Sequence, residues 1–400
     1  MLFLIHPIQT LVRRLIYRGK KLSKPLLKWM GFDVLNRADT ENFLQPFQVY
    51  TVPANPLSLP AIVDFGKPEQ NVFKETEASV VESKIWKLTN TERRATQLSN
   101  GSILIDTKIL ETDYRGSQRL VHSILSRSKR LPVSANTLIA PWSHYMDGIQ
   151  FRGYYDFVLG IASKICRLKQ GLSPLQFQET VVAYPLLHTT YEHEFLGLLG
   201  FHPQRILDSR VYDVNFQNCL IGSSGHWYYP NRADIVLLKS HLEQVLLPKV
   251  ETRDRLYIRR SGRRRVRNEP ELLAMLKKYE FTIIDDKPRT IRQQVSLYKN
   301  ASVIIGPHGA SFTNCIFCEP GTHLIELFSP AYRPDYFRYI AHIMGLTYSA
   351  YCYGRLTANP MSQMDADILV SVDELERGLV SLFTTNRLSQ DVSSGRWRHG

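Results

Sequence analysis

The second half of the sequence alternates regularly between short apolar runs and longer amphipathic segments. The runs "RLYIRR", "FTIIDD", "SVIIG" and "THLIELF" have the length and composition of buried strands. Between them, "NEPELLAMLKKY", "TIRQQVSLYKNA" and "SFTNCIFCE" carry apolar residues at helical spacing, and Asn268 is placed to cap the first of these helices. Strands that alternate with helices form βαβ units, so this half is expected to fold around a parallel sheet.

The first half carries weaker signals of the same two kinds. "SILIDTKIL" at 102–110 is typical of a strand, and "YYDFVLGIASKICRLKQ" at 154–170 is typical of a helix. A chain of 400 residues is too long for one ordinary core, which favours two domains. We expect the boundary after Pro248, where a helical pattern stops and the charged segment "KVETRDR" begins.

The expected organisation has five parts. Prolines are frequent between residues 33 and 84, so few regular elements are expected there. In order, the parts are a basic amphipathic segment over 1–32, an extended lead-in over 33–84, an N-terminal domain over 85–248, a C-terminal domain over 249–385 and a tail over 386–400.

The first 32 residues combine leucines with many basic residues and precede the first acidic residue, Asp33. Such an amphipathic helix can lie on an anionic membrane, and packing on the body of the protein is the alternative that the residues leave open. No stretch approaches the roughly 20 apolar residues of a membrane span. A signal peptide places its positive charge before its apolar stretch, and here that order is reversed.

The net charge of +13 favours an anionic partner such as a nucleotide, a phosphate, an acidic membrane surface or a nucleic acid. The five cysteines are an odd number and do not indicate a disulfide framework, which favours a reducing compartment. Cys315 and Cys318 form a C-x-x-C spacing without a second pair, inside an apolar run. We interpret them as packing residues and expect no metal site.

The loop "GPHGAS" follows the strand-like run "SVIIG" and precedes a helix. Gly306 and Gly309 allow the backbone to approach a ligand closely, and the helix that begins near Ala310 directs free N–H groups toward it. His308 adds a donor for phosphate charge. Ligands of open parallel sheets bind at the carboxyl ends of strands, so we expect an anion site here, although a lone loop histidine is often structural.

A dense arginine cluster lies at another strand end of the same half. Arginine binds phosphate through two parallel hydrogen bonds, so the cluster favours an anionic ligand over a merely solvated loop. Aromatic residues do not interleave with it and no nucleic-acid motif accompanies it, which argues against nucleic acid. Glu326 closes a third strand, where it could accept ribose hydroxyls or form a surface salt bridge. The cluster comprises Arg253, Arg255, Arg259, Arg260, Arg263, Arg264, Arg265 and Arg267.

"YIRRSGRRRVRNEPEL" and "QQVSLYKNASVIIGPHGASFTNCIFCEPGTHLIEL" together resemble the C-terminal half of glycosyltransferase family 61, over roughly residues 255–350. In the other half, "GYYDFVLGIASKICRL" is similar to a family segment, but Asp156 stands where the family often has a histidine and Gly160 where it has an aspartate. The residues that carry the resemblance are Arg259, Arg264, Arg265, Asn268, Glu269, Gln294, His308, Gly309, Ala310, Asn314, Pro320, Gly321 and Glu326.

The resemblance implies a GT-B type α/β fold, with two Rossmann-like domains facing each other across a cleft. It implies an inverting enzyme that needs no metal or cofactor, with a nucleotide-sugar donor, a UDP-sugar in particular, in the C-terminal domain and the acceptor in the N-terminal domain. We expect donor binding by Arg259 or Arg260, Arg264, His308 and the N–H groups after Gly309, with Glu326 and Asn314 holding the ribose or ordering the loop. The expected donor-site residues are Arg259, Arg260, Arg264, Gln294, His308, Gly309, Ala310, Asn314 and Glu326.

Inversion also needs a base for the acceptor hydroxyl. We expect Asp156 in that role, with Asp147, His144 and His188 as rivals; alternatively, Asp156 does no more than complement the dipole of its helix.

These features predict an enzyme that extends a glycan or a lipid-linked glycan in cell-surface polysaccharide biosynthesis. The alternatives are a non-catalytic nucleotide- or carbohydrate-binding protein of a polysaccharide assembly complex and a basic nucleic-acid-binding protein. The cysteine count and the basic N-terminal segment favour a cytoplasmic bacterial enzyme held peripherally at the inner membrane.

Overall fold

The computed structural model describes residues 24–54, 56–89, 95–110, 124, 129–141, 153–223 and 226–393, with side chains up to residue 384. The chain divides into two compact units, Met1–Asn55 with Val80–Val245, and Pro56–Ser79 with Leu246–Gly400. We call them unit 1 and unit 2. Most of the basic N-terminal segment lies outside the described residues. No helix within the described part of the chain is both long and apolar enough to span a membrane.

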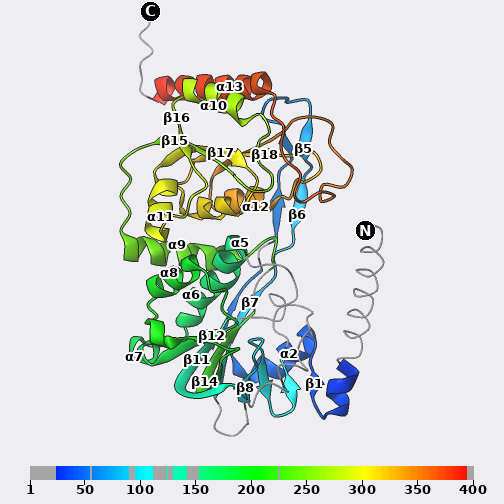
Figure 1. The fold of residues 1–400 in the computed structure, drawn as a ribbon, viewed down its shortest axis with the longest axis vertical. Coiled ribbons are helices and arrows are strands. Elements are labelled where there is room, and N and C mark those ends of the chain that lie inside the picture. The colour runs from blue at the N-terminus through cyan, green and yellow to red at the C-terminus, as the bar shows by residue number, and fades with distance from the viewer. Residues whose placement is uncertain are drawn as a thin grey trace, which may run out of the picture. The chain divides into compact units, whose positions relative to one another are not determined.

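Unit 2 is built on a five-stranded sheet in which every strand pair is parallel, as the sequence predicted. Helices α10 and α13 lie on one face of this sheet, and α11 and α12 lie on the other (Figure 1). In sheet order the strands are β16 (Phe281–Ile284), β15 (Asp254–Ile258), β17 (Ala301–Pro307), β18 (His323–Phe328) and β19 (Thr347–Cys352). The helices are α10 (Glu269–Lys278), α11 (Ile291–Lys299), the 3₁₀ helix η6 (Ala310–Phe317), α12 (Tyr336–Ile343) and α13 (Val372–Ser393).

The sequence explains where two of these helices begin. Thr290 caps α11, since its hydroxyl accepts from the N–H of Gln293 while the Gln293 side chain accepts from the N–H of Thr290. Asn268 is the N-cap residue of α10, as predicted, but its side chain makes no capping hydrogen bond. Its amide instead exchanges two hydrogen bonds with the backbone of Val370, which ties the start of α10 to the segment before α13.

Residues 56–79 of the expected lead-in form a strap that belongs to unit 2, and they contain regular strands that the prolines did not suggest. Strand β3 (Leu57–Leu59) pairs with β6 (Thr76–Ala78), and β4 (Ile62–Val63) pairs with β5 (Asn71–Phe73). The buried Arg338 of α12 holds the strap, because its Nη2 donates to the carbonyls of Leu59, Pro60 and Lys74 at 2.7, 2.8 and 2.9 Å.

Unit 1 contains a six-stranded mixed sheet in the order β13-β12-β11-β14-β7-β2. The first four strands are parallel to one another, and β7 pairs antiparallel with both β14 and β2. The strands are β13 (Ile206–Asp208), β12 (Thr180–Tyr184), β11 (Leu131–Ala140), β14 (Tyr212–Gly222), β7 (Ser83–Thr89) and β2 (Gln48–Val52). The helices are α2 (Arg37–Leu44), α5 (Tyr154–Asp156), α6 (Ser163–Lys169), α7 (Pro174–Gln178), α8 (Thr190–Leu198) and α9 (Arg232–Leu246).

Two predicted elements of unit 1 differ in detail. The helix expected over 154–170 runs from α5 to α6 through a π-helical turn at Phe157–Ala162. The single strand expected over 102–110 is two short strands, β9 (Ile103–Ile105) and β10 (Lys108–Ile109), which pair antiparallel. Asp106 makes the turn between them with φ of 54°, a left-handed conformation that aspartate tolerates better than most residues. These strands belong to a small second sheet with β1 (Asp33–Val34) and β8 (Ala95–Gln97).

Replacing Arg338 with methionine should release the strap. The substitution keeps an apolar stem but removes the charged donor from three carbonyls, so we expect a loss of about 3 kcal/mol in the free energy of unfolding of unit 2. Urea unfolding and limited proteolysis within residues 56–79 measure this. The control Lys74→Met removes an exposed charge of the same strap and should stay within about 0.5 kcal/mol of the unmodified protein. Equal stability of the two variants would contradict the anchoring role.

Candidate functional site

The loop between β17 and η6 places His308 above the carboxyl ends of the central strands of unit 2. His308 is buried, and its Nδ1 lies 2.5 Å from Oε1 of Glu326 on the neighbouring strand β18. The other carboxylate oxygen of Glu326 accepts a hydrogen bond from the hydroxyl of Tyr348 on β19, at 2.7 Å. Glu326 is fully buried, so this arrangement favours loop ordering over the ribose contact as its role.

The Glu326 carboxylate determines the tautomer of His308. An ionised carboxylate can only accept, so Nδ1 carries the proton and Nε2 keeps its lone pair. Burial lowers the pKa of His308, and the charges of Arg264 and Arg260 lower it further, against the opposing effect of Glu326. His308 is therefore neutral in this state, and an anion placed beside Nε2 would favour its protonation.

Aromatic rings surround His308 and restrict its orientation. Phe328 stacks on the imidazole with ring centroids 5.5 Å apart, and Tyr332 meets it edge-on at 5.4 Å. The ring centroids of Tyr336 and Phe337 of α12 lie 5.8 and 5.5 Å from that of His308. The ring is held from several directions, as a preorganised binding group requires.

Four arginines of the predicted cluster pair with carboxylates, among them Arg255 with Glu280 at 3.8 Å. Arg259 pairs with Glu269 at 2.6 Å and with Asp285 at 3.2 Å. The other pairs are Arg263 with Asp365 at 2.9 Å and Arg265 with Asp367 at 3.2 Å. Of the two alternatives expected for the donor, Arg259 is thus already engaged and Arg260 is the available one.

Arg260 and Arg264 form no ion pair with any carboxylate among the described residues. Arg260 donates to the carbonyls of Arg263 and His308, at 2.6 and 3.2 Å. Burial lowers the pKa of Arg260 to about 10, and the charges of Arg264 and Arg263 contribute to the shift. Two partly desolvated positive charges beside the His308 loop are unfavourable alone and are stabilised by a bound anion.

The Arg264 side chain is also fixed in position. Its Nη1 donates to the carbonyl of Met364 at 3.0 Å, and its guanidinium lies over the ring of Tyr332, 5.0 Å from the centroid. Its buried Nε has no hydrogen-bond partner in the described structure. Arg264 has φ of 61°, which a side-chain-bearing residue adopts rarely, and such local strain is commonest at functional sites.

Gly309 is required by the position of Arg260. A Cβ added at residue 309 would lie 1.5 Å from Nη1 of Arg260, well inside van der Waals contact. The constraint is steric and does not come from backbone strain, because φ is 175°. Gly306 has a related role: a Cβ there would lie 2.7 Å from the carbonyl oxygen of Ile258 on β15.

Gln294 and Asn314 bond to each other. The amide of Asn314 donates to Oε1 of Gln294 at 2.7 Å, and Gln294 donates to the carbonyl of Arg289. This contact joins α11 to η6 and supports the helix whose first residue is Ala310. Cys315 and Cys318 are buried in η6 and at its end, in agreement with a packing role. No group of three or more His, Cys, Asp or Glu within the described ranges is arranged to hold a metal ion.

Asp156, the expected base, is buried in the first turn of α5 in unit 1. Its Oδ1 accepts from the indole N–H of Trp227 at 2.8 Å, and its Oδ2 accepts from the N–H of Gly153 at 3.2 Å. Burial raises its pKa to about 6, although both hydrogen bonds oppose the shift. Two of its rivals, His144 and Asp147, lie outside the described residues.

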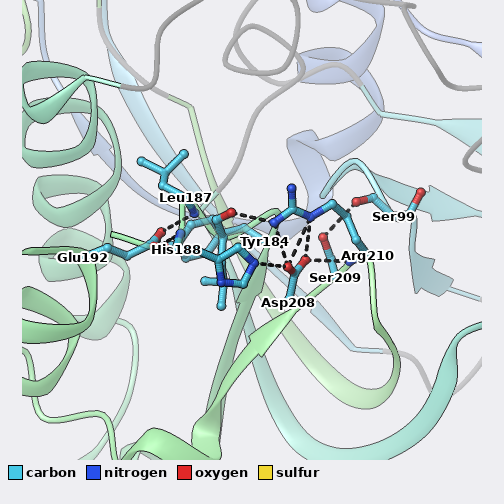
Figure 2. Close-up of polar contacts among 9 residues, drawn as sticks. Ser99, Tyr184, Leu187, His188, Glu192, Asp208, Ser209 and Arg210 are labelled. Atoms are coloured by element: carbon cyan, nitrogen blue, oxygen red, sulfur yellow. Dashed lines mark hydrogen bonds and ion pairs between the residues drawn. The ribbon is translucent and has the colours of Figure 1, made fainter. Parts of the chain in front are cut away.

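The third rival, His188, lies in a polar cluster at the carboxyl ends of β12 and β13. Its Nε2 is 2.9 Å from Oδ2 of Asp208, and Arg210 donates to both oxygens of the same carboxylate (Figure 2). Asp208, Arg210 and Glu192 were not among the residues predicted from the sequence. Glu192 follows Thr189 in the spacing of a capping box, and that signal could have identified the turn.

Comparison with known proteins supports a glycosyl-transfer function. The model of the glycosyltransferase 61 family matches residues 117–325. A beta-1,2-xylosyltransferase of Oryza sativa subsp. japonica is 37% identical over 60 residues, which cover 15% of this chain and 11% of the relative. A beta-1,2-xylosyltransferase of Arabidopsis thaliana is 33% identical over 76 residues, which cover 19% of this chain and 14% of the relative. The matched stretches are thus a small part of either plant protein.

Gly309→Ala should damage the anion site without unfolding unit 2. The new methyl group displaces the Arg260 guanidinium, so we expect the affinity for inorganic pyrophosphate to fall about tenfold or more. Isothermal titration calorimetry measures the affinity. The matched control is Gly262→Ala in the neighbouring loop, where an added Cβ meets nothing within 4 Å. If both variants bind pyrophosphate as the unmodified protein does, the anion does not lie against Arg260.

Proposed function

Since this chain belongs to glycosyltransferase family 61, we propose that it transfers a sugar from a nucleotide-sugar donor to a glycan or lipid-linked glycan, with inversion at the anomeric carbon. The donor would bind in unit 2 and the acceptor in unit 1, in a GT-B type arrangement. Extension of a cell-surface polysaccharide, at the cytoplasmic face of a membrane, is the corresponding biological setting.

The observation that carries this proposal is the pair of guanidinium groups beside the His308 loop, Arg260 and Arg264, which no described carboxylate neutralises. A departing nucleoside diphosphate gains negative charge in the transition state, so fixed cations at that point stabilise it more than they stabilise the bound donor. His308 adds a hydrogen bond once protonated, and Glu326 stabilises the imidazolium. These groups could supply the charge that a divalent cation supplies in other enzymes, and we propose transfer without a metal.

Inversion proceeds by one in-line displacement. The acceptor oxygen forms a bond to the anomeric carbon while the bond from that carbon to the diphosphate oxygen breaks. The electron pair of the broken bond stays on the diphosphate, and a base takes the acceptor's proton. The described candidates for the base are Asp156 and His188. The raised pKa of Asp156, about 6, suits a base, but both of its oxygens already accept hydrogen bonds.

A panel of nucleotide sugars tests which donor binds. It should begin with UDP-xylose, because the names of both plant relatives specify xylosyl transfer. UDP-glucose, UDP-N-acetylglucosamine and GDP-mannose complete the panel. A ligand that binds only the folded protein raises its melting temperature, so we expect thermal shift to select one nucleotide and one sugar. Product analysis with aryl glycosides as acceptors then tests transfer and its stereochemistry. A protein that no nucleoside diphosphate stabilises would contradict the proposal.

Arg264→Met should weaken UDP binding about tenfold or more, because it removes a partly buried charge that no carboxylate of the described chain neutralises. Arg263→Met is the matched control. The exposed guanidinium of Arg263 pairs with Asp365, so we expect a change of less than about threefold. Calorimetric titration with UDP at two salt concentrations measures both effects. Equal losses in the two variants would indicate general electrostatic attraction by the loop instead of a defined site.

A further inference from the structure

The turn between β12 and α8 in unit 1 holds His188 in an uncommon backbone conformation. Its φ is 55°, which is left-handed and unfavourable for most side-chain-bearing residues. Glu192 of α8 stabilises this conformation, since its two oxygens accept from the N–H groups of Leu187 and His188 at 2.9 and 2.7 Å. The hydroxyl of Tyr184 donates to the same carboxylate at 2.7 Å (Figure 2).

A simple connection between a strand and a helix does not need this arrangement. Glu192 is fully buried, and burial of a carboxylate is unfavourable unless hydrogen bonds compensate it. Here the compensating donors are the backbone of the strained turn and a buried tyrosine. The result is a rigid turn that leaves the His188 side chain 60% exposed.

Asp208 orients the exposed imidazole. It lies at the end of β13, beside β12 in the sheet, and Figure 2 shows it between His188 and Arg210. Arg210 donates to Asp208 from Nη2 at 2.7 Å and from Nε at 2.9 Å, and its backbone N–H donates at 2.9 Å. A second bond from Nη2 to the carbonyl of Leu186 fixes Arg210 to the turn. Asp208 is therefore held by His188 on one side and by Arg210 on the other.

The carboxylate sets the tautomer of His188. Burial alone would raise the pKa of Asp208, but the bonds and charge of Arg210, together with His188, hold it below its usual range. Ionised Asp208 accepts from Nε2–H of His188, so Nδ1 carries the lone pair, and no hydrogen bond to Nδ1 is present in the described part of the chain. An exposed imidazole with one nitrogen anchored to a carboxylate can take up a proton at the other.

The position of this pair in the sheet is that of a ligand site. Strands β11, β12 and β13 are parallel, so their carboxyl ends share one edge of the sheet, where open α/β sheets bind ligands. Asp156 is a weaker candidate for the base, because it is buried and each of its oxygens already accepts a hydrogen bond.

We propose that Nδ1 of His188 is the base that takes the proton of the acceptor hydroxyl, with Asp208 as its positioning residue. The inference rests on the proposed glycosyl transfer. As the acceptor oxygen bonds to the anomeric carbon, its proton moves to His188, and Asp208 stabilises the imidazolium that forms. Among the described residues, the titratable and charged groups of the polar cluster around His188 are Asp208, Arg210, Glu192 and Tyr184.

The test compares His188→Asn with the matched control His193→Asn. Asparagine also tolerates left-handed φ, so the turn is preserved, whereas His193 is an exposed residue of the adjacent helix. With UDP-xylose as donor and water or aryl glycosides as acceptor, we expect kcat to fall about 10²- to 10⁴-fold in His188→Asn. UDP affinity should change less than about twofold, since the donor site is untouched.

The pH profile separates a base from a structural residue. In the unmodified enzyme, kcat/KM should fall toward acidic pH, because a protonated His188 cannot accept the proton of the acceptor. Asp208→Asn removes the charge that stabilises the imidazolium, so this acidic limb should move to lower pH. His188→Asn should lose that limb.

Three outcomes decide the question. The inference is supported if His188→Asn loses kcat and the acidic limb while His193→Asn loses neither. If His188→Asn transfers as well as His193→Asn while UDP binding and transfer by the unmodified enzyme persist, His188 is not the base and the proposed function stands. If the unmodified protein neither binds UDP nor processes UDP-xylose or the rest of the donor panel, the proposed function fails and the inference fails with it.

Discussion

The contact between His308 and the buried carboxylate of Glu326 determines the candidate donor site of unit 2. Glu326 stands on a strand whose side chains are all buried, so its charge must be satisfied inside the protein. His308 and Tyr348 satisfy it, and in doing so they fix the loop that follows β17. That loop in turn presents its carbonyl to Arg260, and Gly309 leaves room for the guanidinium.

Unit 1 uses the same device at the equivalent edge of its own parallel strands. A fully buried glutamate, Glu192, holds the turn that carries His188, as Glu326 holds the loop that carries His308. The two histidines differ in surroundings and therefore in chemistry. His308 is enclosed by aromatic rings and lies near two cations that no described carboxylate pairs, which suits an anion. His188 is exposed and bonded to an ionised carboxylate, which suits proton uptake.

Much of unit 2 was predictable because its signals are local. The parallel sheet follows from strand and helix patterns, and the glycines around His308 mark a loop in which the backbone lies close to its neighbours. The strap over 56–79 was missed, because its strands are short and depend on contacts with α12, which is distant in sequence. The N-cap position of Asn268 was predicted correctly, but the partner of its side chain was not, because the amide bonds to the backbone of Val370, which is distant in sequence.

The sequence by itself determined the family resemblance, the alternation that makes a parallel α/β sheet, and the residues crowded at its carboxyl edge. Only the tertiary structure decided which charges remain available there. Arg263 and Arg264 are neighbours in sequence, yet Asp365 neutralises the first and no described carboxylate reaches the second. Likewise, Glu326 and Asp208 acquire their roles from histidines on other elements. The physical reason is that a charge takes its pKa and its availability from partners that folding brings within hydrogen-bond distance, and these partners are far away along the chain.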